Sequence, residues 1–286
     1  MHGLLRPLFL AIVLPGFFLN AQATPADISR GIAWLQAQVS PDGRMKAEFS
    51  SASPQQVRCE TAITLLKLVG RNPKTVGLVA SLHQSGPDVP TQYLACEQML
   101  RQQLGHATRK PEVELRRLKG QGYTTYQGDS ASNPLDSGFA LSAQLQNLAP
   151  ADKANVLAWL QANQASDGSF LANGVPDLYS TAVVRRGLQR EIRKSPVAGV
   201  IAKQATTYLL GKETAAGNWN DDVTSTALIF GAVQPYATSN PGIASGVATY
   251  LLGKQLPNGS WANDAFVTAV AVRALSLTAK PVKNAR

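Results

Sequence analysis

Residues 250–269 read YLLGKQLPNGSWANDAFVTA, and this stretch holds the pattern that organises the chain. The aromatic residue Tyr250 is followed eight and nine positions later by the turn dipeptide Asn258-Gly259, and two positions further on by Trp261. A helix-like stretch that contains Thr268-Ala269 comes next. The same order and spacing recur in three further segments, which begin at Trp34, Trp159 and Tyr208. Such repetition at a fixed spacing is the signature of a repeat architecture.

Each repeat reads as a helical hairpin. The stretch before the turn has helical composition, and a glycine in the turn is typical of a residue with positive φ at a helix C-terminus. We expect the aromatic residue after that glycine to fold back on the preceding helix as a clamp. A second helix, rich in Ala and Val, suits burial on all sides. The turn glycines are Gly43, Gly168, Gly217 and Gly259.

Two degenerate repeats complete the set. One runs from Glu112 through Gly122 to Ser137-Gly138, and another fits between residues 75 and 104. A single hairpin cannot bury its apolar face, so neighbouring hairpins must stack. We therefore predict an all-α fold, a six-hairpin (α/α)6 toroid that forms one domain over residues 24–280.

The N-terminus resembles a cleavable signal peptide over residues 1–23. Arg6 precedes a short apolar run, and Ala21-Gln22-Ala23 fits a cleavage site. A membrane anchor is the alternative, but the run is under the length of a span and contains proline and glycine. We expect a secreted or periplasmic protein with no transmembrane segment after signal removal and a basic tail at residues 281–286.

Composition limits the partners. The chain has 27 Lys and Arg against 18 Asp and Glu, a formal net charge of +9, and 44% hydrophobic residues. The apolar content excludes a disordered chain. The basic residues are scattered, so we expect no nucleic acid partner, whereas a small molecule or an acidic glycan fits the charge. We expect a monomer without a cofactor.

The repeats resemble the QW motif of squalene and oxidosqualene cyclases. Residues 250–261 match it best, residues 159–170 match it as well, and residues 208–219 depart by Glu213 in place of Gln. The resemblance extends to the superfamily of α/α toroids, which includes terpenoid cyclases, protein prenyltransferase β subunits, thioester domains and cobalamin carriers. It implies the toroid fold over nearly the whole mature chain, but a fold does not determine an activity.

The catalytic motifs of these families are incomplete here. The Asp-x-Asp-Asp acid of the cyclases has its nearest match in residues 218–221, with Asn at both leading carboxylate positions. The Asp-x-Cys of the zinc-dependent prenyltransferases does not occur, so we expect no metal site. The thioester motif is also absent, because Gln98 lies two residues after Cys96 rather than three.

The two cysteines fall in neighbouring hairpins. Cys59 and Cys96 both lie early in the second helix of their hairpins, and in an oxidising compartment they would form a disulfide. Two buried free thiols are the alternative.

Acidic residues recur close to the start of the second helices. One interpretation is that they cap these helices. The other is that they gather at one mouth of the ring, where two carboxylates could act as acid and base on a sugar or another ligand. These candidate catalytic residues are Asp136, Asp177, Asp221, Asp222 and Asp264.

Aromatic and basic residues supply the candidate ligand contacts. They are Tyr123, Tyr179, Arg186, Trp219 and Arg273. Because each known catalytic set is missing, the sequence favours a binding or carrier module for a small molecule, a glycan or a partner protein. The alternative is a glycan-active or terpenoid-cyclase-like enzyme that uses carboxylates at the toroid mouth.

Overall fold

The computed structural model describes residues 23–46, 50–106, 110–144, 147–237 and 239–279. Apart from Ala23, the predicted signal peptide lies outside the described residues, as does the predicted basic tail.

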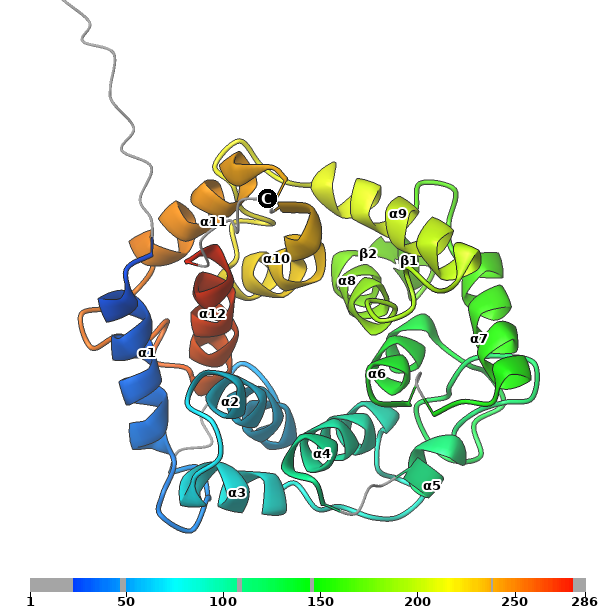
Figure 1. Cartoon of the computed structure of the whole chain (residues 1–286), viewed down its shortest axis with the longest axis horizontal. Helices are drawn as coiled ribbons and strands as arrows, with labels where there is room; N and C mark the ends of the chain where they lie inside the picture. The colour runs from blue at the N-terminus through cyan, green and yellow to red at the C-terminus, as the bar shows by residue number, and fades with distance from the viewer. Residues whose placement is uncertain (1–22, 47–49, 107–109, 145–146, 238, 280–286) are drawn as a thin grey trace, which may run out of the picture.

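Twelve helices in the described residues form two concentric rings (Figure 1). The outer ring consists of α1 (Pro25–Gln38), α3 (Pro73–Ala80), α5 (Lys110–Glu114), α7 (Pro150–Ala162), α9 (Pro196–Leu210) and α11 (Pro241–Gly253). The inner ring consists of α2 (Pro54–Leu68), α4 (Thr91–Leu104), α6 (Pro134–Gln144), α8 (Leu178–Gly187), α10 (Val223–Ala237) and α12 (Ala265–Thr278). Each inner helix contacts the next, and α12 contacts both α1 and α2, which closes the ring. The predicted six-hairpin toroid is confirmed.

Local sequence signals set where the helices begin. Proline occupies the start of five outer helices, where its missing N–H costs nothing and its fixed φ suits the helix. Capping boxes precede three helices, at Thr24, Ser53 and Asn72. These signals are local, so each helix start depends on residues that are close to it in sequence.

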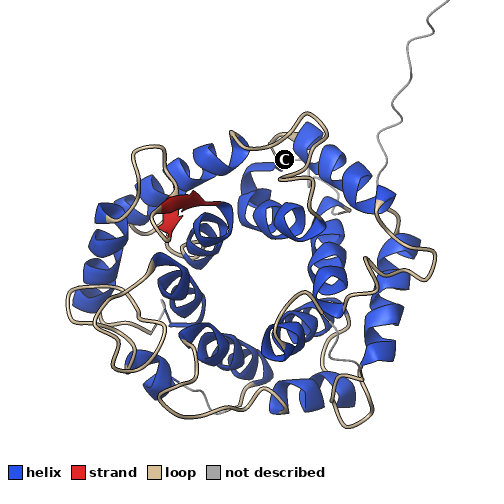
Figure 2. Ribbon diagram, turned by 180° about the vertical axis from the view of Figure 1, so that it is seen from behind, coloured by secondary structure: helices blue, strands red, loops and turns tan. Residues whose placement is uncertain are grey.

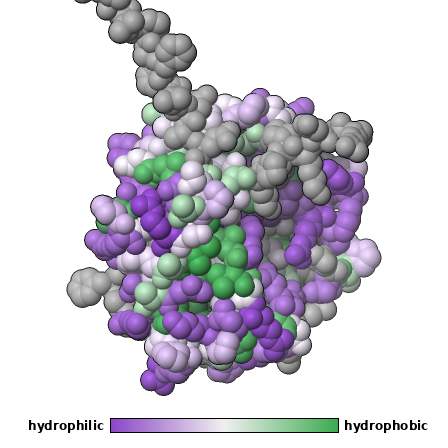
Figure 3. Space-filling view, turned by 60° about the vertical axis from the view of Figure 1, so that its left-hand side comes forward, coloured by the Kyte–Doolittle hydropathy of each residue, from purple (hydrophilic) through white to green (hydrophobic). Residues whose placement is uncertain are grey.

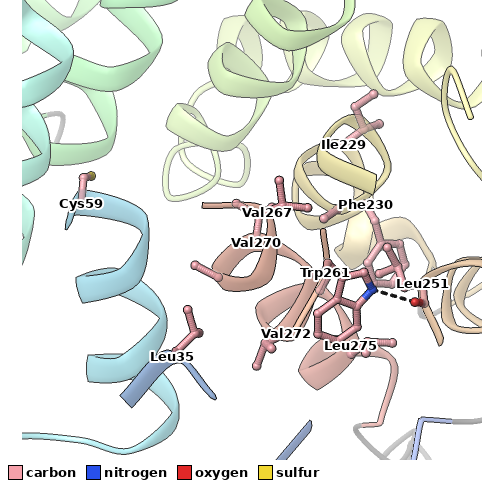
Figure 4. Packing of buried hydrophobic residues seen from close by; sticks show 14 of the residues in the cluster. Leu35, Cys59, Ile229, Phe230, Leu251, Trp261, Val267, Val270, Val272 and Leu275 are labelled. Atoms are coloured by element: carbon pink, nitrogen blue, oxygen red, sulfur yellow. Dashed lines mark hydrogen bonds between the residues drawn. The ribbon is translucent and has the colours of Figure 1, made fainter. Parts of the chain in front are cut away.

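The core lies between the two rings. Leu35 from α1, Leu251 from α11 and Val270 from α12 are buried in one hydrophobic cluster, shown in Figure 4. The outer surface seen in Figure 3 is mostly hydrophilic, with one group of hydrophobic side chains near the middle of the view.

The repeated tryptophans are clamps, as predicted. Trp261 is buried, and its Nε1–H donates to the carbonyl oxygen of Leu251 in the preceding helix at 2.7 Å (Figure 4). Trp219 donates in the same way to the carbonyl oxygen of Leu209, also at 2.7 Å. Each indole therefore ties the turn to the end of the helix before it.

In three of the four Thr-Ala pairs, those of Thr181, Thr226 and Thr268, the threonine accepts a hydrogen bond from the turn. The backbone N–H of Trp261 donates to Thr268 Oγ1 at 3.0 Å, and that of Trp219 donates to Thr226 Oγ1 at 3.0 Å. In the degenerate repeat, Ser137 Oγ accepts from the backbone of Tyr123 at 2.8 Å. The spacing between the turn and the Thr-Ala or Ser-Gly pair therefore corresponds to a hydrogen bond between the turn and the inner helix.

The turn glycines have positive φ but lie beyond the helix ends, so the predicted helix-terminal position is corrected. Gly217 has φ 71°, and a Cβ there would lie 2.6 Å from Cα of Gly246 in α11. Gly259 has φ 90°, and a Cβ there would lie 2.6 Å from the carbonyl oxygen of Arg30 in α1. Each turn therefore packs against the backbone of the next outer helix, and the turn at Gly259 closes the ring.

One β-hairpin interrupts the helical pattern (Figure 2). Strands β1 (Phe170–Ala172) and β2 (Val175–Asp177) pair antiparallel around an Asn173-Gly174 turn, in which both residues have positive φ. An Asn-Gly turn is a strong hairpin signal, and the sequence analysis missed it. Among the described residues, no helix has the length and apolar character needed to span a bilayer.

Candidate functional site

A cavity of about 370 Å³ lies at the centre of the inner ring. All six inner helices contribute to its lining, mainly through their middle and C-terminal parts. Its volume falls in the range of about 300–1,000 Å³ found for small-molecule sites. The larger apolar side chains of the lining are Ile63, Met99, Phe139, Leu228 and Leu277.

The cavity also contains an ion pair. Arg273 of α12 lines the cavity, and its Nη2 lies 2.5 Å from Oε2 of Glu60 in α2. The two side chains are 12% and 7% exposed. Burial raises the pKa of Glu60, but attraction by Arg273 and Arg186 outweighs burial and holds this pKa below its ordinary value. Glu60 is therefore a carboxylate at neutral pH.

Arg186 of α8 supplies a second guanidinium to the same region. It lines the cavity and is attracted by Glu60, but its side chain donates no hydrogen bond to another described residue. A half-buried guanidinium with open donors is suited to bind a carboxylate or a phosphate.

Tyr179 lies beside these charged groups. Its ring makes an edge-to-face contact with Phe139 of α6, with the centroids 6.4 Å apart. Burial is the main cause that raises the pKa of Tyr179, so its hydroxyl stays protonated. Of the predicted ligand contacts, Arg186 and Arg273 line the cavity, whereas Tyr179 lies close enough to interact with their charges but does not line it.

The disulfide is present and faces the cavity. Cys59 of α2 is bonded to Cys96 of α4, and both residues line the cavity. The predicted pairing is confirmed, which excludes the alternative of two free thiols.

The recurring aspartates lie away from this cavity. Asp177 accepts from the backbone N–H of Ser180 at 2.6 Å, and Asp222 accepts from that of Ser225 at 2.6 Å. Asp264 accepts from the backbone N–H groups of Phe266 and Val267. These three carboxylates cap inner helices at the N-terminal ends, whereas the cavity lies toward the C-terminal ends. These aspartates therefore have the capping role that was one of the two interpretations of the sequence, and a pocket at their mouth of the ring stays a prediction.

Asp136 and Asp221 do not join the cavity either. Asp136 is buried, and its Oδ2 accepts from Thr125 Oγ1 and Asn133 Nδ2, both at 2.7 Å. Burial raises its pKa. Asp221 has a side chain that is 76% exposed, 3.9 Å from Nζ of Lys254. Neither aspartate lines the cavity.

Two of the aromatic candidates have structural positions instead. Tyr123 is fully buried, and its hydroxyl donates to Glu114 Oε1 at 3.2 Å. Trp219 is equally buried in its clamp. Neither side chain lines the cavity, so neither is placed to contact a ligand bound there.

Glu60 was missed by the sequence analysis although a signal was present. It directly precedes Thr61-Ala62, whereas the residues before the other Thr-Ala pairs are Ser180, Ser225 and Val267. A carboxylate inside a helix that is otherwise suited to burial requires a charged partner. Arg186 and Arg273, which occur five residues after their threonines, were the available partners.

No protein-family model matches this sequence, and no curated protein sequence matches it. Solved structures do match the fold. A variant of the type II terpene cyclase MstE from Scytonema, in complex with its substrate geranylgeranyl dihydroxybenzoate, has a TM-score of 0.68 at 14% identity. This match covers 89% of the present chain and 97% of the cyclase chain. A protein from Actinoplanes has a TM-score of 0.69 at 17% identity, and covers 89% and 99% of the two chains.

A third similar structure is ent-copalyl diphosphate synthase from Streptomyces platensis. It has a TM-score of 0.60 at 18% identity, and the match covers 81% of this chain and 50% of the synthase chain. At these identities the similarity concerns the fold. The chain has the α/α-toroid fold of terpenoid cyclases.

Proposed function

Given this terpenoid-cyclase-like fold, we propose that the protein binds a molecule with an isoprenoid chain and an anionic group in its central cavity. The observation that carries the proposal is the lining, which combines large apolar side chains with polar and basic groups that include the guanidinium of Arg186. Apolar walls favour an isoprenoid chain because binding removes its surface from water. The guanidinium favours a carboxylate or a phosphate, since charges attract more strongly away from bulk water.

The structural neighbours support both parts of this ligand. The MstE complex contains geranylgeranyl dihydroxybenzoate, in which an isoprenoid chain is joined to a benzoate. The Streptomyces enzyme is named for copalyl diphosphate, a terpenoid that carries a diphosphate. An acidic glycan, which the sequence also allowed, would find fewer hydrogen-bond partners than its polar groups require, because much of this lining is apolar.

The geometry favours binding over proton-initiated cyclisation. A cyclase of this kind needs a carboxylic acid that is protonated before the reaction. Among the described residues, no Asp or Glu lines the cavity. Glu60 contacts Arg273, which does line the cavity, and is held in the charged form. Asp136 has a raised pKa but lies outside the lining. The similar structures support a terpenoid-cyclase-like enzyme, the alternative that the sequence allowed, more than they support a carrier, and this enzyme is the second candidate.

A blocked cavity tests the proposal. Gly231 of α10 lines the cavity, and a Cβ there meets nothing within 4 Å, so the ring of Gly231→Phe has room to stand in the cavity. Gly242 of the outer helix α11 is equally open but exposed, which makes Gly242→Phe the matched control. We expect calorimetric titration to detect geranylgeranoic acid binding to the wild type and to Gly242→Phe, and at least tenfold weaker binding to Gly231→Phe.

Equal affinity in all three proteins, or no binding to the wild type, would refute a cavity site. Mass spectrometry of the ligand after incubation separates the two candidates. Unchanged ligand supports binding, whereas a cyclised product supports the enzyme.

We also propose that this binding takes place outside the cytoplasm. The signal-like pattern of residues 1–23 supports export, and the Cys59–Cys96 disulfide supports an oxidising compartment. N-terminal sequencing of the protein recovered from the periplasm or the medium should find a start near Thr24. Recovery with Met1 intact in the cytoplasm would contradict export.

A further inference from the structure

Positively charged groups outnumber negatively charged groups beside the cavity. Two guanidiniums, those of Arg186 and Arg273, act on the single carboxylate of Glu60. The carboxylate is in direct contact with Arg273 but has only a longer-range attraction to Arg186. Arg273 is therefore neutralised by a partner, whereas Arg186 keeps an uncompensated charge.

This arrangement carries one formal positive charge, on the half-buried guanidinium of Arg186. Lys67 and Arg190 also line the cavity, but both are exposed, where water and salt screen their charges. A ligand with a single negative charge would balance the buried cluster. A ligand with two or three negative charges would carry its excess charge toward Glu60, and the repulsion grows with each added charge.

Resting on the proposed function, we infer that Glu60 sets the charge of the ligand, because it neutralises Arg273 and leaves a cavity that selects a monoanion over a polyanion. Glu60 is thus a positioning and specificity-determining residue that need not touch the ligand. The ligand class is an isoprenoid carboxylate or another monoanion, rather than a prenyl diphosphate.

Three probes with the same isoprenoid chain measure this selectivity. They are geranylgeraniol, which is neutral, geranylgeranoic acid, which carries one negative charge, and geranylgeranyl diphosphate, which carries more. We expect the wild type to bind the acid at least tenfold more tightly than the alcohol, and more tightly than the diphosphate.

Glu60→Gln keeps the shape of the side chain and removes its charge. Because each additional ligand charge then loses its repulsion, we expect the affinity ratio of diphosphate to acid to rise about tenfold. The matched control is Glu97→Gln. Glu97 is another buried carboxylate, in the neighbouring helix α4, with its Oε1 3.0 Å from Nε of Arg101, and it does not line the cavity. We expect the control to keep the wild-type ratio.

The outcomes separate the two proposals. If the wild type binds none of the probes, the proposed function fails. If the acid binds but Glu60→Gln leaves the ratio of diphosphate to acid unchanged, the inference about Glu60 fails alone. Should Glu60→Gln not fold, the wild-type order still decides, since tighter binding of the diphosphate than of the acid would overturn the inference.

Discussion

The disulfide between α2 and α4 gives the most quantitative prediction. Replacing both cysteines, in Cys59→Ser/Cys96→Ser, removes a cross-link between residues that are 37 apart in sequence. A bond that closes a loop of this length restricts the unfolded chain. The chain-entropy relation gives about 4 kcal/mol of stabilisation at 25 °C.

The magnitude converts to a thermal shift. In a domain of this size, 1 kcal/mol corresponds to about 2–4 °C in Tm, so the double variant should melt about 8–16 °C below the wild type. Both cysteines are nearly buried, at 7% and 4% exposure, but they face a cavity that can hydrate the serine hydroxyls. We therefore expect little additional cost from the hydroxyls and an unchanged helical content.

Thermal unfolding followed by far-UV circular dichroism measures the shift. Wild type treated with a reductant provides the control, because it loses the same cross-link without a substitution. The reduced wild type should melt close to the double variant. A fall of less than 2 °C in both samples, with the disulfide confirmed in the untreated protein, would refute this account of its stabilising effect.

Three further predictions concern the turns and caps. Gly217→Ala should destabilise the protein by about 1–3 kcal/mol in urea unfolding, and by more than Gly120→Ala, which has a similar φ but no close neighbour. Asp177→Ala should cost about 0.5–2 kcal/mol as a lost cap, and its ligand affinity in titrations should stay at the wild-type value. Burial raises the pKa of Asp264, but hydrogen bonds from Ser51 and its neighbours hold it below the ordinary value. Its stabilisation should therefore be lost as the pH falls below about 4, and Asp264→Asn should show a weaker loss of Tm in acid.

The fold was predictable because its determinants are local and repeated. The interval from Tyr250 to Trp261 encodes a helix, a turn and a clamp within a dozen residues. The structure accounts for each part through the bond from Trp261 to Leu251 and the bond to Thr268. The hairpin of β1 and β2 was missed because the repeat spacing was given more weight than the Asn173-Gly174 turn.

The site was predictable only in part, since it forms when distant helices meet. Arg186 and Arg273 could be named because they occupy equivalent positions in two repeats. Glu60 lies in the first hairpin and contacts Arg273 of the last, so its role depends on closure of the ring. The aspartates were assigned to a pocket because capping residues gather at one end of parallel helices. Which end holds the cavity depends on the packing of all six inner helices, and a single sequence does not reveal that.

A crystal structure of the protein with geranylgeranoic acid would show whether the central cavity is the binding site. We expect the isoprenoid chain to lie against Ile63, Met99 and Leu277 in this cavity, with the carboxylate within hydrogen-bond distance of the Arg186 guanidinium. A ligand bound on the outer surface, or at the aspartate-capped ends of the inner helices with the cavity empty, would contradict this expectation.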